Sequence, residues 1–355
     1  MAAIVSVGTA VPEHRIGQAD VRNAVRHMFE ASVHNIDRFL PIFEHSEIET
    51  RHFCAPLDWF QHPRSVEEKH ALFVQSAVDL AERAVRSCLG RAGTEPGDID
   101  HIFMVTTTGT VTPSLDAYLF NRLSFRPHIK RTPIWGLGCA GGAAGLSRAA
   151  EYVKAFPKQK ALLVSVELCS LTFIRNDTSK SNIVATSLFA DGAAAALVAG
   201  DECDGIGTGG RPAPRIVSTQ STIWPESLDV MGWDVTNEGL KVIFSKDIPS
   251  IIARYMHPNV EELSNSVGWP PESIEYFILH PGGAKVLTAY EEALRLPKER
   301  LDASRRILRD YGNMSSCTVL FVLEDILRGG TEPGSRGLAG ALGPGFSSEL
   351  LLLQF

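Results

Sequence analysis

Two stretches of this chain repeat the same order of features, and this repeat constrains the fold more than any other part of the sequence. Gly97–Val105 and Pro271–Leu279 each read as a turn, acidic residues and a buried strand. A turn of small residues that opens a helix follows in each half, at Gly138–Gly141 and at Gly312–Ser315, and equivalent positions lie about 175 residues apart. Although any α/β chain repeats strand, loop and helix, this constant spacing predicts two duplicated α/β halves.

Short apolar runs bounded by glycine, proline or polar turns predict buried strands, and longer periodic runs predict helices between them. The predicted strands are Ile4–Val7, Ile102–Thr106, Ala161–Val166, Ala193–Val198, Tyr276–Leu279 and Glu349–Leu353. The predicted helices are Ala71–Ala92, Ser114–Leu123, Gly141–Ala155, Ile248–His257, Lys285–Leu294 and Ser315–Leu327. The polar stretch Gly200–Arg215, rich in glycine and proline, separates the halves, which we place at residues 1–200 and 201–355.

Composition excludes several classes of protein. The 355 residues carry a net charge of −7, whereas a general nucleic-acid-binding protein would show a basic stripe. No apolar run reaches the length of a membrane span. Met1–Gly8 reads as a first strand, because it has no basic region before its apolar run and no room for a signal core. The six cysteines form no CxxC pair and are too sparse for a disulfide scaffold. We therefore expect no metal site, and reduced thiols in the cytoplasm.

Cys139 is the strongest candidate for chemistry. It lies among glycines in Trp135–Gly145, immediately before a helix of small residues. Glycines allow a substrate to approach closely, and the positive end of a helix dipole lowers the pKa of a thiol and favours the nucleophilic thiolate. The alternative is a buried cysteine at a tight packing point, which is the usual state of a free cysteine.

Three further segments complete the candidate site. His280 ends an apolar strand and precedes Pro281-Gly282-Gly283, which would leave the imidazole at the mouth of a cavity as a partner for Cys139. Asn313 lies at a turn entering a helix and is either a helix cap or an amide donor to an oxyanion. Gly343–Gly345 reads as a simple hairpin or as a wall of the active site.

Taken together, these segments resemble one family over the whole chain. The nucleophile turn at Cys139, HPGG at His280–Gly283, GNMSS at Gly312–Ser316 and GPG at Gly343–Gly345 are similar to motifs of the thiolase superfamily, and within it of the chalcone-synthase-like, or type III, polyketide synthases. Leu188–Ala193 also resembles that family's LFGDGA segment.

The resemblance implies a five-layered thiolase-like fold of two pseudo-duplicated halves in an α-β-α-β-α arrangement. It implies that Cys139 is the nucleophile, paired as a thiolate with an imidazolium at His280, and that His280 and Asn313 stabilise the enolate of decarboxylated malonyl-CoA. It also implies acyl-CoA and malonyl-CoA as substrates, no cofactor, and a homodimer.

Substrate-binding residues are carried over from the same resemblance. Phe189 matches a gatekeeper between the CoA tunnel and the cavity, and Val242 matches a second one, for which Phe244 is an alternative. The remaining candidates are Arg51 for a CoA phosphate, Gly282 and Gly283 beside the histidine, and Cys169, Thr172 and Ser315 in the cavity wall. Ordinary core packing is the competing interpretation of the cavity residues.

Three departures from the plant enzymes indicate a different starter. Arg51 is the one basic residue left in Ser46–Arg51, Thr112 replaces a methionine that reaches across the dimer, and Val230–Val235 differs from the plant cavity wall. A smaller gatekeeper at Val242 suits a long aliphatic chain, because pocket volume determines what enters. We therefore expect a fatty acyl-CoA starter that gives alkylpyrones or alkylresorcinols.

Several alternatives stay open at this point. An aromatic starter would make the chain chalcone-synthase-like in activity as well as in sequence. A ketoacyl-ACP synthase of fatty-acid synthesis also uses Cys, His and Asn, and a hydroxymethylglutaryl-CoA synthase would need a catalytic glutamate such as Glu167. A cysteine hydrolase and a non-catalytic scaffold are the remaining possibilities.

Overall fold

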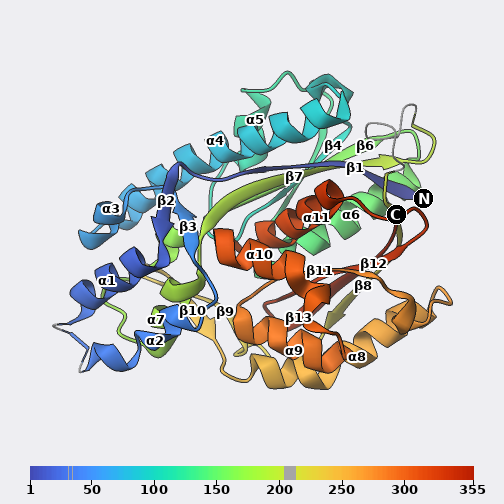
Figure 1. The fold of residues 1–355 in the computed structure, drawn as a ribbon. Helices are drawn as coiled ribbons and strands as arrows, with labels where there is room; N and C mark the ends of the chain where they lie inside the picture. Colours follow the sequence, from blue (N-terminus) through green and yellow to red (C-terminus); the bar gives the residue numbers. More distant parts are fainter. Residues whose placement is uncertain (31, 34, 204–212) are drawn as a thin grey trace.

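The computed structural model describes residues 1–30, 32–33, 35–203 and 213–355 (Figure 1). Within these residues, nine strands form one mixed sheet in the order β11-β12-β13-β8-β1-β7-β6-β4-β5. The strands are β1 Ala2–Ala10, β4 His101–Val105, β5 Lys130–Ile134, β6 Lys160–Leu168, β7 Asp191–Gly200, β8 Arg215–Ile223, β11 Tyr276–Leu279, β12 Arg336–Gly343 and β13 Ser347–Gln354. Two small two-stranded sheets lie beside it, formed by β2 His14–Gly17 with β3 Thr50–Phe53 and by β9 Met231–Thr236 with β10 Gly239–Phe244.

The helices complete a layered structure. Figure 1 shows α4 over the first-half strands, α6 and α11 in the middle, and α8 and α9 on the opposite side. The α-helices are α1 Gln18–Phe29, α2 Pro41–Glu44, α3 Leu57–Gln61, α4 Val66–Ala92, α5 Leu115–Phe120, α6 Gly141–Ala155, α7 Lys180–Leu188, α8 Ile248–Asn265, α9 Ala284–Leu294, α10 Asp302–Tyr311 and α11 Thr318–Gly329. The predicted α-β-α-β-α layering is confirmed.

The two halves pair their strands in the same order and sense. In the first half β1 is antiparallel to β7, β7 is antiparallel to β6, and β6 is parallel to β4. In the second half β8 is antiparallel to β13, β13 is antiparallel to β12, and β12 is parallel to β11. This match bears out the pseudo-duplication read from the sequence. The division at residues 200 and 201 stays a prediction, and residues 204–212 of the predicted boundary lie outside the described residues.

The two halves meet closely at the central helices α6 and α11, because the first turn of α6 and the turn that precedes α11 consist of small residues. A Cβ on Gly142 would lie 2.1 Å from the backbone oxygen of Ser316, and a Cβ on Gly145 would lie 2.4 Å from Leu163 Cδ1. Only glycine permits such close approach between a helix and neighbouring chain. The start of α6 is thereby pressed against the turn that precedes α11, which places the two repeat turns side by side.

We expect Gly142→Ala to destabilise the fold by about 2 kcal/mol or more, because the added methyl group has no space and the obstructing atom is backbone. Gly90→Ala is the matched control. Gly90 lies within α4, and no atom lies within 4 Å of the position that its Cβ would take, so alanine there is expected to stabilise the helix by about 0.5–1 kcal/mol. Chemical denaturation measures both changes, and equal midpoints for the two variants would contradict the packing argument.

Several elements differ from the sequence-based expectation for identifiable reasons. Helix α4 begins earlier than predicted, because Ser65 and Glu68 form a capping box ahead of it. Helix α8 continues through Pro258, and its buried residues on both sides of that proline keep it packed on the sheet. The predicted helix Ser315–Leu327 is divided into a 3₁₀ turn, Ser315–Cys317, and α11.

Candidate active site

The nucleophile turn connects β5 to α6 through a 3₁₀ turn, Gly138–Ala140, so Cys139 lies at the entrance of a central helix. Gly138 has a φ of +48°, and a Cβ there would lie 2.7 Å from Pro344 Cδ. A Cβ on Gly343 would likewise lie 2.6 Å from the backbone oxygen of Leu137. The Gly343–Gly345 segment is therefore both the hairpin between β12 and β13 and a surface packed directly against the nucleophile turn.

Four hydrogen bonds fix Asn313, two through its backbone and two through its side chain. Its backbone N–H donates to the Leu188 oxygen at 2.9 Å, and its own oxygen accepts from Ala190 N at 2.8 Å. Its Oδ1 accepts from Ser315 N at 2.8 Å, and its Nδ2 donates to the Gly282 oxygen at 3.0 Å. An amide nitrogen carries two hydrogens, so one donor of a rigidly oriented carboxamide is left for a ligand.

His280 directly follows β11, and its backbone N–H donates to the Gly340 oxygen at 2.9 Å. The side chain is 3% exposed, and neither imidazole nitrogen hydrogen-bonds to any described residue. The bond from Asn313 to Gly282 joins the loop after His280 to the asparagine turn. The structure thus places an imidazole with unused nitrogens on the loop that the Asn313 carboxamide binds.

Burial acts against ionisation of both the thiol and the imidazole. It raises the pKa of Cys139 to about 12, although contacts with Ser315 and Asn313 pull that pKa down, and the Glu167 carboxylate pushes it up. Burial alone lowers the pKa of His280 to about 3. The resting groups are therefore a neutral thiol and a neutral imidazole, and a thiolate–imidazolium pair stays a prediction for the moment of reaction.

The buried imidazole predicts a specific pH dependence of stability. Because the pKa of His280 is lower in the folded chain than in the unfolded one, stability is fully present above about pH 6.5 and is lost as the pH falls toward 3. At pH 5 the penalty is about 2 kcal/mol. We expect His280→Asn to lose less stability than the wild type between pH 7.5 and pH 5, as measured by urea denaturation.

The exposed residue His128 offers a matched control, because His128→Asn removes an imidazole that is in contact with solvent. This variant is expected to keep the wild-type difference between the two pH values. If His280→Asn also keeps the full wild-type difference, the buried imidazole does not set the acid sensitivity.

A buried carboxylate, Glu167, supports the nucleophile turn through hydrogen bonds that pass by way of Thr107. Its Oε2 accepts from the backbone N–H groups of Thr107 and Thr108, each at 3.0 Å, and its Oε1 accepts from Ser316 Oγ. The Thr107 hydroxyl in turn accepts from Gly138 N at 3.0 Å. Both carboxylate oxygens accept hydrogen bonds, so Glu167 is a structural support rather than a free acid. The sequence contained no signal for the role of Thr107.

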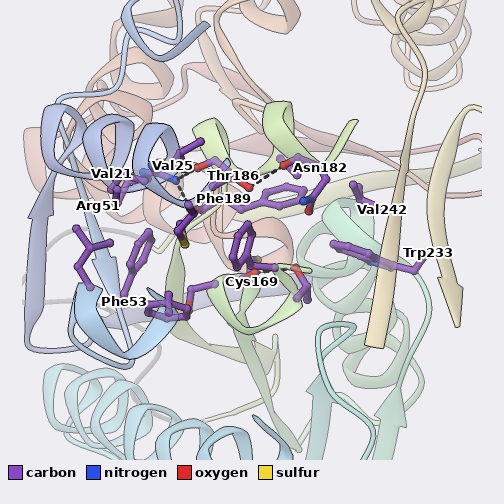
Figure 2. Close-up of a pocket in the computed structure, with 18 residues that line it drawn as sticks. Val21, Val25, Arg51, Phe53, Cys169, Asn182, Thr186, Phe189, Trp233 and Val242 are labelled. Carbon is purple, nitrogen blue, oxygen red and sulfur yellow. Dashed lines mark hydrogen bonds between the residues drawn. The ribbon is translucent and has the colours of Figure 1, made fainter. Parts of the chain in front are cut away.

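A cavity with about 540 Å³ of free space, part of it open to solvent, lies beside this site. Figure 2 shows Arg51 and Phe53 at one end of it and Trp233 and Val242 at the other. Helix α1, which the sequence analysis missed, supplies an apolar wall through Val21 and Val25. The lining residues are Val21, Ala24, Val25, Met28, Arg51, Phe53, Leu57, Phe60, Cys169, Ser170, Thr172, Phe173, Asn182, Ala185, Thr186, Phe189, Trp233 and Val242.

The predicted substrate residues are divided between this cavity and the catalytic turns. Arg51, Cys169, Thr172, Phe189 and Val242 line the cavity. The other three lie at the turns, since the Ser315 N–H donates to Asn313 Oδ1, the Gly282 oxygen accepts from Asn313, and Gly283 directly precedes α9. Phe244, the alternative gatekeeper, packs on the cluster of Phe189 and Val242 without lining the cavity.

The expected role of Arg51 at a CoA phosphate is wrong. Arg51 has no exposed surface, and its Nη1 donates to the backbone oxygens of Thr186 and Phe189 at 2.7 and 2.8 Å. Burial lowers the pKa of its guanidinium to about 9, and Asp191 opposes this effect. A cation without solvent contact cannot meet a phosphate at the surface.

Fold and site together define a class. Two stacked α/β halves, with a cysteine at the entrance of one central helix and an asparagine turn before the other, are those of the thiolase-like acyltransferases. The model for the N-terminal domain of chalcone and stilbene synthases matches residues 1–202, and the model for their C-terminal domain matches residues 215–355. The chain belongs to this family and is a type III polyketide synthase.

Similar proteins agree with this assignment over the full length. The chain is 44% identical over 361 residues to a protein named putative chalcone synthase from Bacillus subtilis, covering 100% of this chain and 99% of that one. It is 36% identical to a 1,3,6,8-tetrahydroxynaphthalene synthase from Streptomyces peucetius, covering 99% and 93%. The solved 1,3,6,8-tetrahydroxynaphthalene synthase from Streptomyces coelicolor superposes with a TM-score of 0.92 at 28% identity, over 99% of each chain.

Two further findings apply to the described part of the chain. No helix there is long and apolar enough to cross a bilayer. No group of three or more His, Cys, Asp or Glu residues there is arranged to hold a metal ion.

Proposed function

We propose that the chain loads an acyl-CoA starter on Cys139 and extends it by decarboxylative Claisen condensation with malonyl-CoA. The observation that carries this proposal is the close packing of the Cys139 turn on the asparagine turn, where a Cβ on Gly142 would lie 2.1 Å from the Ser316 oxygen. Phe189, which forms a bridge with Asn313, lines an apolar cavity beside these turns. A nucleophile from one half then lies close to an amide donor from the other, and a space of ligand size lies nearby.

The steps follow from the protonation states. Because the resting thiol and imidazole are neutral, the thiol proton passes to His280 as sulfur attacks the thioester carbonyl. CoA leaves as its thiol, and the acyl group remains on Cys139. The Asn313 N–H that Gly282 does not bind and His280 then polarise the malonyl-CoA carbonyl, carbon dioxide leaves, and the enolate carbon attacks the Cys139 thioester. The carbon–sulfur bond breaks, which releases the Cys139 thiolate and gives a β-ketoacyl-CoA. Transfer of this chain back to Cys139 allows the next extension. Repeated extension and ring closure complete the product.

The shape and polarity of the cavity support a fatty acyl starter and alkylpyrone or alkylresorcinol products. Most of its lining is aliphatic or aromatic. Two of the polar side chains are engaged elsewhere, since Asn182 Nδ2 donates to the oxygens of Ile174 and Asp177 and the Thr172 hydroxyl donates to the Cys169 oxygen. Arg51 is an exception, because its Nε and Nη2 have no partner among the described residues. A wall that is mostly apolar favours an alkyl chain over a hydroxylated starter.

A second candidate is synthesis of 1,3,6,8-tetrahydroxynaphthalene, which the 36% identity to the Streptomyces peucetius enzyme favours. An aromatic starter of the chalcone synthase kind is a third outcome. Incubation with labelled malonyl-CoA alone, and with lauroyl-, palmitoyl-, coumaroyl- and acetyl-CoA, separates these candidates by product mass. Absence of malonyl incorporation under every condition would overturn the proposed reaction.

Val242→Phe is expected to restrict the cavity and lower kcat/KM for palmitoyl-CoA by about 10-fold or more, while that for acetyl-CoA changes much less. The reason is that Val242 is buried against Phe189 and Cys169, so the phenyl ring of the variant would occupy space that the acyl chain needs. Val235→Phe is the matched control, because Val235 is exposed on the neighbouring strand. An equal loss for both starters in Val242→Phe would count against the long-chain site.

The proposal includes a homodimer in the cytoplasm. Strand β5 forms an edge of the sheet, and Trp135, immediately after it, is 53% exposed. An edge strand beside an exposed aromatic side chain is suited to association with a second copy. Cys54, Cys88, Cys139, Cys169 and Cys317 form no disulfide bond with any described residue, as is usual in a reducing compartment. Light scattering on the purified chain measures the oligomeric state.

A further inference from the structure

The C-terminal end of α7 has no glycine cap, yet its last carbonyl groups are bound by donors from distant parts of the chain. Gln18 Nε2 donates to the Ser187 oxygen at 2.9 Å, and the Asn313 N–H donates to the Leu188 oxygen at 2.9 Å. Arg51 Nη1 donates to the oxygens of Thr186 and Phe189. A helix normally leaves its last carbonyls unpaired, so the position of this end depends on these donors.

Arg51 also contacts the asparagine turn through its aliphatic stem. A Cβ on Gly312 would lie 2.8 Å from Arg51 Cγ and 2.9 Å from Cδ, so the Gly312 backbone packs directly on the arginine. Phe189 and Asn313 form a parallel bridge immediately beyond, with the Ala190 N–H donating to the Asn313 oxygen. We call this bridge the Phe189–Asn313 junction. The buried Arg51 side chain contacts both sides of it, through the Phe189 oxygen and through Gly312.

The hydrogen bonding of Arg51 is incomplete. Its Nε and Nη2 have no hydrogen-bond partner among the described residues, and the bonds of its Nη1 go to backbone carbonyls rather than to a carboxylate. A buried guanidinium with unpaired N–H groups costs stability, and replacement by an apolar residue of similar volume is often neutral or stabilising. A gain in stability therefore does not explain why a cation stands at this position. The two bonds from Arg51 to the C-terminal end of α7, which the helix dipole strengthens, indicate instead that Arg51 holds this end in place.

We propose that Arg51 is a positioning residue, which fixes the Phe189–Asn313 junction and through it the orientation of the Asn313 carboxamide. The inference rests on the proposed function, in which Asn313 polarises the carbonyl of malonyl-CoA. Asn313 Nδ2 binds the Gly282 oxygen, two residues from His280. A displacement at the junction therefore changes the geometry of enolate formation, while the Cys139 turn keeps its own support from Thr107 through Gly138.

Arg51→Met and Arg51→Lys test this role. Methionine retains a long stem beneath Gly312 but removes both bonds to α7, whereas lysine retains a cation that can donate to the same carbonyls. We expect Arg51→Met to lower malonyl-CoA decarboxylation about 10- to 100-fold, as for a misplacement of about 1 Å in a catalytic group. Acylation of Cys139 by starter acyl-CoA in a single turnover, read by intact mass, is expected to change by less than about 3-fold. Arg51→Lys should recover most of the decarboxylation.

Arg175→Met is the matched control, because Arg175 also donates to a backbone oxygen, that of Gln61, away from the junction. It is expected to leave decarboxylation and acylation at wild-type levels. Equal losses of decarboxylation and acylation in Arg51→Met would show a general structural role and overturn the proposal, and so would an unchanged decarboxylation rate.

Hydrogen exchange provides a readout that does not depend on activity. The amides of Ala190 and Asn313 both donate across the junction, so Arg51→Met should exchange them at least about 10-fold faster, with the β6 amides unchanged. Unchanged protection at the junction overturns the positioning role even if the wild type has no polyketide activity. If the wild-type protein does not decarboxylate malonyl-CoA but Arg51→Met still exchanges the junction amides faster, the result counts against the proposed function alone. If Arg51→Met does not fold, Arg51→Lys must show intermediate exchange at these amides.

Discussion

Cys139→Ala is expected to abolish chain extension, with a loss of about 10⁴-fold or more, because no acyl-enzyme forms without the thiol. Malonyl-CoA decarboxylation is expected to continue, since its donors, Asn313 and His280, come from the other half of the chain and keep their bonds to the Gly282 loop and to β12. Intact mass after exposure to a starter acyl-CoA should show the acyl adduct on the wild type and none on the variant. Release of acetyl-CoA measures the decarboxylation.

Cys88→Ala is the control for this experiment. Cys88 is also a buried cysteine, but it lies in α4 and bonds to Ser6 of β1 rather than to a residue of the catalytic turns. Its removal should leave both activities in place and change only stability. Chain extension that survives in Cys139→Ala would show that another group carries the acyl chain.

Asn313→Asp is expected to lower malonyl-CoA decarboxylation about 10²- to 10³-fold, the usual cost of removing one oxyanion donor. Aspartate keeps the shape of the side chain and an oxygen that accepts from Ser315 N, so the turn before α11 retains that bond. It loses the amide that binds the Gly282 oxygen, and a carboxylate there repels an enolate as its charge develops. Decarboxylation and single-turnover acylation, measured on the same protein, separate this effect from a loss of loading.

Asn259→Asp makes the same chemical change at another buried asparagine. Asn259 binds Ser348, Gln220 and Thr222 between α8 and the second-half strands, away from the catalytic turns. It is expected to reduce stability and to leave the decarboxylation rate of the folded protein unchanged. If both variants lose decarboxylation equally, the amide of Asn313 has no special role.

The strands that could be read from the sequence are those buried on both faces. β1, β6 and β7 are continuous apolar runs, and such runs are recognisable without knowledge of their neighbours. β9 and β10 are half exposed and lie outside the main sheet, so their composition contains little pattern. β12 is also buried but was missed, because glycines at Gly337, Gly340 and Gly343 interrupt its apolar residues and leave no continuous apolar run.

The same distinction holds for the site. Cys139, His280 and Asn313 were proposed from local motifs, because glycine turns at a nucleophile and at an amide donor leave a local pattern. Their catalytic roles stay predictions. The assignment of Arg51 to a phosphate failed, because its sequence neighbours give no indication that the carbonyls of α7 enclose it.

The sequence by itself determined the α/β class, the duplication and the residue types at the two repeat turns, because each of these depends on local composition and spacing. Only the tertiary structure decided how the groups are charged and what holds them. Burial makes the thiol and the imidazole neutral, α1 forms a wall of the acyl cavity, and Arg51 binds the end of α7. These properties depend on dielectric environment and on contacts between residues more than a hundred positions apart, which no local pattern contains.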